Sequence, residues 1–227
     1  MKILVSDFDN TFFTNRIDNN VNLVNKFRDE GNLFIIATGR PIYLIKPEIE
    51  KHNIKYDYLI CNDGAVIFDQ EDNIVDKTNI DYQTAIQIYN MIIRSNNVEH
   101  VYIDAITDFG DLDASDYNGV LALPYDRDEA LKLTEYINKK YPSVQAYMSH
   151  RWINVLSVEA SKGIAIKFLE NANSWDVNNI YVVGDNNNDA SMLVYNNSFG
   201  IEAGNPDYLD RCLYRIKKFE EIFKYIK

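Results

Sequence analysis

Apolar and amphipathic stretches alternate through the first third of the chain. The runs Lys2–Ser6, Leu33–Ala37 and Tyr58–Cys61 are short, aliphatic and partly β-branched or aromatic, which is typical of buried strands. Val21–Glu30 between them has helical spacing, and a second helix is expected after Pro41, because proline suits the first turn of a helix. The order strand, helix, strand, helix, strand predicts right-handed crossovers and a parallel sheet.

The same alternation returns late in the chain. The expected elements are a helix over Gly163–Asn171, a strand over Ile180–Val183, a helix over Ala190–Tyr195 and a strand over Phe199–Ile201. These two stretches predict one α/β core that is built from residues 1–79 and 155–227.

The middle of the chain, residues 80–154, has a different pattern. Its expected helices and strands are Tyr82–Arg94, Val101–Ala105, Val120–Leu123, Arg127–Lys140, Val144–Met148 and Trp152–Val158, of which the first and fourth are helices. The turn Ser149–Arg151 is expected to join the last two strands as a hairpin. We therefore predict an α+β domain inserted into the α/β core.

Composition narrows the class of partner. The 227-residue chain has 34 acidic and 23 basic residues, a net charge of −11, which would repel a nucleic acid duplex. No apolar run approaches the roughly 20 residues that a membrane helix needs, so no membrane partner is expected. The expected partner is a small molecule, and the oligomeric state is left open.

The cysteines bear on the cellular compartment. Cys61 and Cys212 are far apart in sequence and lie in apolar surroundings, so we expect buried, reduced thiols. The chain starts on a strand, which leaves no room for a signal peptide. Both observations favour a cytoplasmic protein. Three histidines and two cysteines form no zinc-ligand pattern.

Polar residues follow each expected core strand. Open parallel sheets bind ligands outside the carboxyl ends of their strands, so these residues are expected to converge on one rim. They are Asp7 and Asp9, then Thr38-Gly39-Arg40, then Asn62-Asp63-Gly64, and finally Gly184–Asp189.

The chemistry of that rim points to phosphate. Asp7, Asp9 and Asp185 would form an oxygen-rich cage of the kind that suits Mg²⁺. Thr38 offers a hydroxyl group and backbone N–H groups at the start of a helix, and Lys162 offers a point charge. A carboxylate nucleophile, a cation and donors around an anion are together the parts for phosphoryl transfer.

Each part also has a simpler interpretation. Asp7 to Thr11 suits an ordinary loop, and a lysine before a helix, such as Lys162, is usually a solvated surface charge. The stretch Gly184–Asp189 resembles a calcium-type loop or an Asn-rich turn, although no Glu closes an EF-hand pattern at the twelfth position. The order of the motifs along the chain is more specific than any one of them.

That order resembles the haloacid dehalogenase (HAD) superfamily phosphatases, in the Cof-like branch with a C2-type cap. "DFDNT" matches the first family motif, "TGR" at 38–40 the second, Lys162 in "SKG" the third and "GDNNND" at 184–189 the fourth. The resemblance covers essentially the whole chain and implies a Rossmann-like parallel-sheet core with an inserted α+β cap domain. The insert at 80–154 stands where this family has its cap, between the second and third motifs.

The resemblance also implies a role for each site residue. Asp7 would be the nucleophile that forms an aspartyl-phosphate, and Asp9 the general acid and base. The groups that would hold Mg²⁺ are Asp7, the main-chain carbonyl of Asp9, and Asp185, supported by Asp189 and Asn188. Thr38, Gly39 and Lys162 would bind the phosphoryl group, and Arg40 and Asn188 the substrate. Stretch 108–118 and the Ser149–Arg151 turn of the cap would contact the leaving group.

Two positions depart from the family pattern. Asn10 stands where the family usually has Gly, but Asn tolerates a left-handed backbone. Asp63 replaces an Asn before Gly64 and adds a carboxylate that would disfavour a dianion unless its side chain points away.

The implied activity is that of a Mg²⁺-dependent phosphatase, a phosphoric monoester hydrolase, acting on a small phosphorylated metabolite, with a sugar phosphate as the first guess. A phosphomutase would use the same aspartyl-phosphate chemistry. A receiver-like signalling domain or a non-catalytic phosphate-binding protein are the alternatives outside enzymes.

Overall fold

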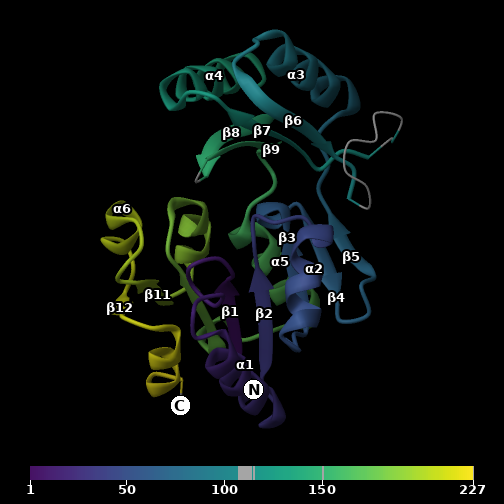
Figure 1. Ribbon diagram of the computed structural model, residues 1–227. Coiled ribbons are helices and arrows are strands. Elements are labelled where there is room, and N and C mark those ends of the chain that lie inside the picture. Colours follow the sequence, from purple (N-terminus) through teal and green to yellow (C-terminus); the bar gives the residue numbers. More distant parts are fainter. Residues whose placement is uncertain (107–113, 115, 150, 227) are drawn as a thin grey trace. The chain divides into compact units, whose positions relative to one another are not determined.

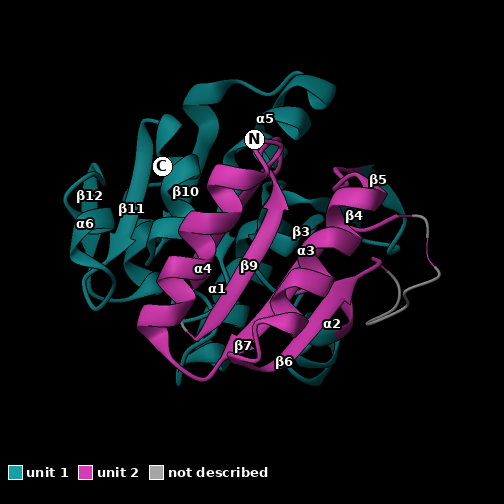
Figure 2. Ribbon diagram, turned by 90° about the horizontal axis from the view of Figure 1, so that it is seen from above, with its two compact units in different colours: residues 1–40, 44–76, 161–227 teal, residues 41–43, 77–160 magenta. Residues whose placement is uncertain are grey.

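The computed structural model describes residues 1–106, 114, 116–149 and 151–226. The chain divides into a core unit (residues 1–40, 44–76 and 161–227) and an insert unit (41–43 and 77–160), coloured separately in Figure 2. The insert unit extends beyond the expected 80–154 at both ends. It includes all of strand β9 (Trp152–Ser157), because β9 pairs with strands of the insert sheet.

The core unit is built on an eight-stranded sheet with the order β12-β11-β10-β1-β2-β3-β4-β5. Its strands are β1 (Ile3–Asp7), β2 (Leu33–Ala37), β3 (Tyr58–Cys61), β4 (Val66–Asp69), β5 (Ile74–Lys77), β10 (Ile180–Gly184), β11 (Asn197–Ile201) and β12 (Tyr214–Ile216). All pairs from β12 to β3 are parallel, and β3 pairs with β4 antiparallel. The α/β class and the parallel core predicted from the sequence are confirmed.

Helices cover both faces of this sheet. They are α1 (Ile17–Asp29), α2 (Ile42–Lys51), α5 (Lys162–Asn173) and α6 (Pro206–Leu209), with 3-10 turns η1 (Asn62–Gly64), η2 (Val177–Asn179), η3 (Asn187–Val194) and η4 (Phe219–Lys224). On one face, α5 and η3 pack on the apolar side chains of β1, β2 and β10. On the other face, α1 contacts β2 and η4, and the Phe12 ring lies 5.0 Å from that of Phe34 and 5.2 Å from that of Phe219.

The insert unit is a four-stranded antiparallel sheet with two helices packed on one of its faces (Figure 1). The sheet order is β6-β7-β9-β8, and the other elements are α3 (Tyr82–Arg94), β6 (Val98–Asp104), β7 (Gly119–Pro124), α4 (Arg127–Lys140) and β8 (Val144–Ser149). Both helices start at aspartate N-caps, Asp81 and Asp126, whose carboxylates accept backbone N–H groups of the first turn. The expected β8–β9 hairpin is present.

Several expectations need correction. The segment 190–195 was expected as a helix, but residues 190–194 belong to the 3-10 turn η3, and Tyr195 follows it as the C-cap. Strands β4, β5 and β12 were not predicted. Cys61 is buried as expected, but Cys212 is only half-buried, and the two cysteines do not form a disulfide bond. Most of the stretch 108–118 lies outside the described residues, as does His150 of the predicted cap turn. Within the described part of the chain, no helix is long and apolar enough to span a membrane.

Candidate active site

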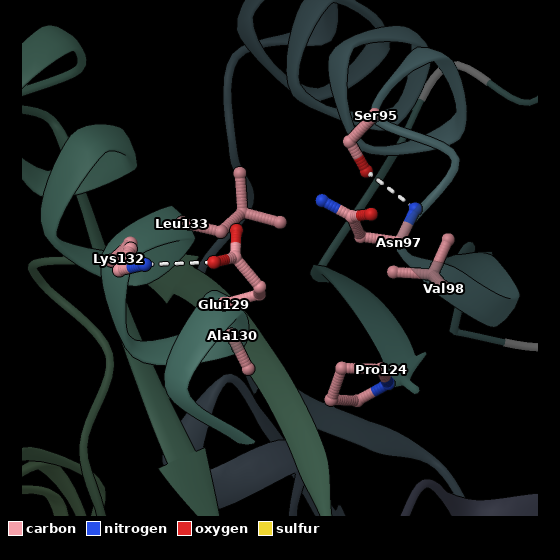
Figure 3. A pocket seen from close by; sticks show the side chains of 8 residues that line it. All are labelled: Ser95, Asn97, Val98, Pro124, Glu129, Ala130, Lys132 and Leu133. Atoms are coloured by element: carbon pink, nitrogen blue, oxygen red, sulfur yellow. Dashed lines mark hydrogen bonds and ion pairs between the residues drawn. The ribbon is translucent and has the colours of Figure 1, made fainter. Parts of the chain in front are cut away.

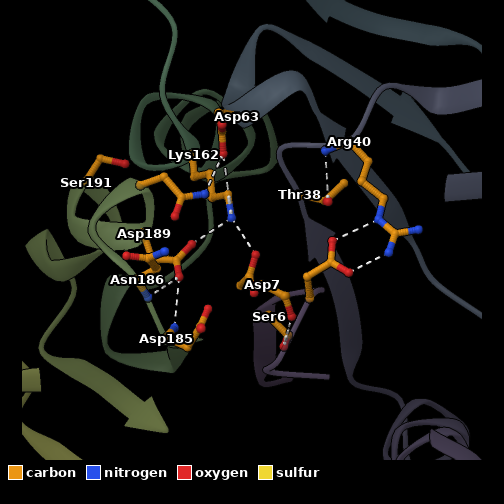
Figure 4. A network of polar contacts seen from close by, with 12 residues as sticks. Ser6, Asp7, Thr38, Arg40, Asp63, Lys162, Asp185, Asn186, Asp189 and Ser191 are labelled. Atoms are coloured by element: carbon orange, nitrogen blue, oxygen red, sulfur yellow. Dashed lines mark hydrogen bonds and ion pairs between the residues drawn. The ribbon is translucent and has the colours of Figure 1, made fainter. Parts of the chain in front are cut away.

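The polar loops after β1, β2, β3 and β10 converge, because these four strands are neighbours in the sheet (Figure 4). Asp7 is the last residue of β1, Thr38 and Asp185 directly follow β2 and β10, and Asp63 lies in η1 directly after β3. Ion pairs join residues of different loops, among them Lys162 with Asp7 and Asp63. The sequence-based expectation of one polar rim is therefore met within the core unit.

Lys162 lies at the centre of this rim, with its side chain completely buried. Its ammonium Nζ is 2.6 Å from Asp7 Oδ1, 2.6 Å from Asp189 Oδ1 and 3.8 Å from Asp63 Oδ1. Burial opposes its charge, but the carboxylates of Asp189, Asp7 and Asp63 outweigh this effect and raise the Lys162 pKa. Lys162 is therefore not a solvated surface charge but the cation that neutralises part of an acidic cluster.

The start of α5 holds Lys162 in place. The Ser161 hydroxyl caps the helix by accepting the N–H of Ile164 at 3.2 Å. The next residue, Gly163, packs so closely on η3 that an added Cβ would lie 2.1 Å from the Ser191 carbonyl oxygen. Its N–H donates to Ser191 Oγ at 3.0 Å. The Lys-Gly pair of the third motif thus lets α5 approach the loop that carries Asp189.

Asp189 organises the loop after β10. Its Oδ2 accepts the backbone N–H groups of Asp185 and Asn186 at 2.9 and 3.1 Å, while its Oδ1 accepts from Lys162. Gly184 leaves room for this carboxylate, because a Cβ there would lie 2.4 Å from Asp189 Oδ2. Asp189 is fully buried, and Asp185 is 9% exposed.

Asp7, Asp185 and Asp189 form a group suited to a metal ion. One carboxylate oxygen from each lies within 4.8 Å of the others. Asp7 Oδ2 is buried and has no hydrogen-bond partner among the described residues. Burial, followed by the charge of Asp189, raises the pKa of Asp7 well above its ordinary value. An orphaned buried oxygen in an all-carboxylate donor set fits a hard divalent cation such as Mg²⁺.

Asp9 is not one of the three carboxylates of this group, and its side chain pairs with Arg40. Arg40 Nε lies 2.8 Å from Asp9 Oδ2, and Nη2 lies 2.5 Å from Oδ1, so the contact is bidentate. The guanidinium also lies 5.2 Å from the Phe8 ring centroid and 5.8 Å from that of Phe13. Hydrogen bonding to Asp9 raises the pKa of Arg40. Only the main-chain carbonyl of Asp9 was expected to hold metal, and its carboxylate is half-exposed.

The surroundings of Thr38 differ from the expected helix N-terminus. Helix α2 starts at Ile42, not at Thr38. The Thr38 N–H donates to the Ile60 carbonyl at 2.8 Å, and its Oγ1 accepts the Arg40 N–H at 3.1 Å. These two N–H groups are therefore already engaged. Thr38 is 1% exposed and Gly39 is half-buried, next to the carboxylate of Asp63.

The two departures from the family pattern have clear structural consequences. Asn10 has a left-handed φ of 62°, which Asn tolerates better than most residues. Asp63 points into the site: it is 5% exposed, and its Oδ1 accepts the side-chain N–H of Asn188 at 2.9 Å. Sequence reasoning marked Asp63 as an added acid but did not find its contacts. Its place directly after a core strand was the available signal.

A pocket lies within the insert unit, beside the first turns of α4 (Figure 3). It is lined by Ser95, Asn97, Val98, Pro124, Glu129, Ala130, Lys132 and Leu133. Lys132 Nζ donates to Glu129 Oε1 at 2.7 Å, so these two charges satisfy each other. Asp7, Lys162 and the other rim residues of the core unit are not among its lining residues.

Comparisons with known proteins agree with the motif pattern. The family profile of the haloacid dehalogenase-like hydrolases matches residues 4–107 and 91–222. An uncharacterised protein of Mycoplasma capricolum is 29% identical, and the match covers 97% of this chain and 98% of that protein.

Solved structures share the fold. A haloacid dehalogenase-like hydrolase from Bacteroides thetaiotaomicron superposes with a TM-score of 0.85 at 12% identity, covering 99% of each chain. A second protein of that organism, described among the phosphatases of the HAD enzyme superfamily, has a TM-score of 0.78 at 15% identity and covers 99% of this chain and 92% of its own.

Proposed function

The chain belongs to the haloacid dehalogenase-like hydrolase family, in its Cof-like branch, and from this premise we propose that it is a Mg²⁺-dependent phosphatase. The observation that carries the proposal is the position of Asp7. Its carboxylate ends a core strand and places one oxygen on the buried ammonium of Lys162. The other oxygen lies near Asp185 and Asp189 and has no hydrogen-bond partner in the described part of the chain. One of the solved structures that share this fold is described as a phosphatase, which is consistent with this activity.

The proposed metal ligands are the carboxylates of Asp7, Asp185 and Asp189 with the main-chain carbonyl of Asp9. A bound Mg²⁺ would supply Lewis-acid polarisation of a phosphoryl oxygen. Asp7, Asp63 and Asp189 surround Lys162 with more negative charge than its single positive charge balances. This excess of negative charge favours the binding of a divalent cation.

Asp7 is the proposed nucleophile. One of its carboxylate oxygens forms a bond to phosphorus as the bond from phosphorus to the leaving oxygen breaks, giving an aspartyl-phosphate. Lys162, Thr38 and Gly39 bind the phosphoryl oxygens. Lys162 is already charged and fully desolvated, so its electrostatic contribution is stronger than that of an exposed lysine.

Asp9 is the proposed general acid and base. It donates a proton to the leaving oxygen in the first step and removes one from the attacking water in the second, which releases phosphate and regenerates Asp7. The bidentate contact with Arg40 fixes the orientation of this carboxylate. This gives Arg40 a role in positioning Asp9, besides any contact with substrate.

The proposed substrate class is a small phosphorylated metabolite, with sugar phosphates as the first candidates, and the proposed location is the cytoplasm. A panel of phosphate esters, assayed with Mg²⁺ and with EDTA, tests this proposal. Mg²⁺-dependent release of phosphate that is lost in Asp7→Asn supports a phosphatase. Phosphoryl return to substrate with a bisphosphate activator would indicate a phosphomutase, and binding of phosphate without turnover would indicate a non-catalytic or receiver-like protein.

A further inference from the structure

The backbone around Asp63 is unusual. Asn62, Asp63 and Gly64 have consecutive positive φ values of 50°, 49° and 104°. Gly64 packs directly on the residue before Lys162, since an added Cβ would lie 2.2 Å from the Ser161 carbonyl carbon and oxygen. Left-handed conformations at two non-glycine residues in a row cost free energy, so this turn is maintained by its surroundings. The turn directs the Asp63 carboxylate into the rim.

Asp63 lies close to three other parts of the rim: the loop after β10, the start of α5 and the loop after β2. Its Oδ1 accepts from Asn188 Nδ2 at 2.9 Å and lies 3.8 Å from Lys162 Nζ. Its Oδ2 lies 3.0 Å from the point where a Cβ on Gly39 would be. The backbone N–H of Asp63 donates to the Thr38 carbonyl at 2.9 Å.

These contacts set up a competition for Lys162. Asp7 and Asp189 accept two hydrogen bonds from the ammonium, and Asp63 is the third carboxylate near it. An ammonium has three donors in total, so a phosphoryl oxygen that binds Lys162 shares it with these acids. Asp63 also adds a negative charge close to an incoming dianion in a site with little water to screen it.

We propose that Asp63 is a positioning residue that lowers the affinity of the rim for phosphate and so promotes release of the inorganic phosphate product. The inference rests on the proposed function, because it takes the Lys162 rim to be the phosphoryl site. The proposed effect depends on the negative charge of Asp63. An amide of the same shape would keep the contact with Asn188 and remove the repulsion between Asp63 and phosphate.

The test is the affinity of inorganic phosphate for the Mg²⁺-loaded protein, measured by isothermal titration calorimetry in wild type and Asp63→Asn. Asn is a suitable replacement, because it also tolerates the left-handed φ at this position. We expect the Kd to fall about tenfold, from the loss of one unit charge near the anion at an intermediate dielectric constant. The KM for p-nitrophenyl phosphate should fall with it, and kcat should not rise.

A matched control separates this effect from net charge. Asp29→Asn removes one negative charge at an exposed position in the last turn of α1 and should leave the phosphate Kd unchanged. Asp63→Ser is a second neutral variant, used if Asp63→Asn does not fold, and its Kd should fall in the same direction. Circular dichroism of each variant establishes that it is folded.

Equal phosphate affinity in wild type and a folded neutral variant would overturn the role of Asp63 while leaving the proposed function intact. Tighter binding in Asp29→Asn as well would overturn it too, because the loss of any one negative charge would then suffice. If wild type neither binds phosphate nor hydrolyses any ester, the proposed function fails and the inference fails with it.

Discussion

Arg40 donates hydrogen bonds to both carboxylate oxygens of Asp9, at distances of 2.8 and 2.5 Å. The planar guanidinium matches a carboxylate in a way that a lysine ammonium does not. Its position over the Phe8 ring further restricts the guanidinium. The residue proposed as general acid is therefore held from the loop after the neighbouring strand β2.

Arg40→Ala should lower kcat for esters with poor leaving groups by about tenfold or more, because Asp9 loses its fixed orientation. Steady-state kinetics with an alkyl phosphate measures this. Arg28→Ala is the matched control, since Arg28 makes a bidentate pair with Asp57 at 2.8 and 2.7 Å in the same unit. It should reduce the free energy of unfolding and leave kcat unaltered. A rise in KM alone for Arg40→Ala would assign Arg40 to substrate binding instead.

Asp9→Asn should reduce turnover of alkyl phosphates more than turnover of p-nitrophenyl phosphate. A good leaving group needs little protonation, whereas help from a general acid is typically worth ~10²–10⁴-fold for a poor one. Single-turnover measurements isolate the first step, which matters because Asp9 is also proposed to assist the second. Equal losses on both esters in that step would contradict the acid role.

Without metal, the charged form of Asp7 should destabilise the folded protein, so stability should depend on pH. Burial raises the Asp7 pKa above the ordinary 3.8 in the folded chain. Folding therefore favours the protonated form, and this contribution to stability is lost as the pH rises from 3.8 through the raised pKa. With EDTA, the melting temperature of wild type relative to Asp7→Asn should fall as the pH rises through this window.

Adding Mg²⁺ at neutral pH should raise the melting temperature of wild type and restore activity, whereas Ca²⁺ should not restore activity, because its larger and irregular coordination shell would misplace the nucleophile. Differential scanning fluorimetry across pH, with and without metal, measures both effects on stability. A wild-type minus Asp7→Asn difference that does not change with pH would contradict the burial-raised pKa. Full activity in EDTA would refute the metal site.

Gly64→Ala should destabilise the core unit by about 2–5 kcal/mol, the sum of a left-handed backbone penalty and forced displacement of Ser161. Gly31→Ala is its control, because Gly31 also has a positive φ of 83° but no atom within 4 Å of an added Cβ. It should cost only about 1–2 kcal/mol, the backbone penalty alone. Urea unfolding of both variants measures the free energy of unfolding. An equal decrease in both would show that the close approach of Gly64 to Ser161 adds no steric penalty.

Sequence patterns located the long elements well, for a physical reason. Strands β2 and β3 and helices α3 and α4 have the predicted bounds, because strong apolar periodicity and flanking polar residues define them. Strands β4, β5 and β12 have only three or four residues, and the exposed β5 has no apolar run to reveal it. The edge strands β5 and β12 depend on pairing rather than on their own composition, and β4 was missed because it is short.

The sequence predicted which residues lie at the rim better than it predicted which side chains pair there. The rule that ligands bind at the carboxyl ends of parallel strands placed Asp7 and Asp185 on one rim, whereas Lys162 was singled out only because it precedes a helix. It could not show that Asp9 faces Arg40 or that Asp63 turns toward Lys162, because side-chain direction depends on backbone dihedrals such as the positive φ of Asp63. One-dimensional spacing carries no information about those angles.

The most direct test of the central claim is to trap the phosphoryl group on Asp7. Asp9→Asn protein is mixed with Mg²⁺ and p-nitrophenyl phosphate, quenched in acid and digested, and the peptide that contains Asp7 is analysed by mass spectrometry. Loss of the general base should slow hydrolysis of the aspartyl-phosphate, so the account predicts a phosphoryl adduct on Asp7 that is absent when Asp7 is also replaced by Asn. Ester turnover with no adduct on Asp7, or with an adduct on another residue, would contradict it.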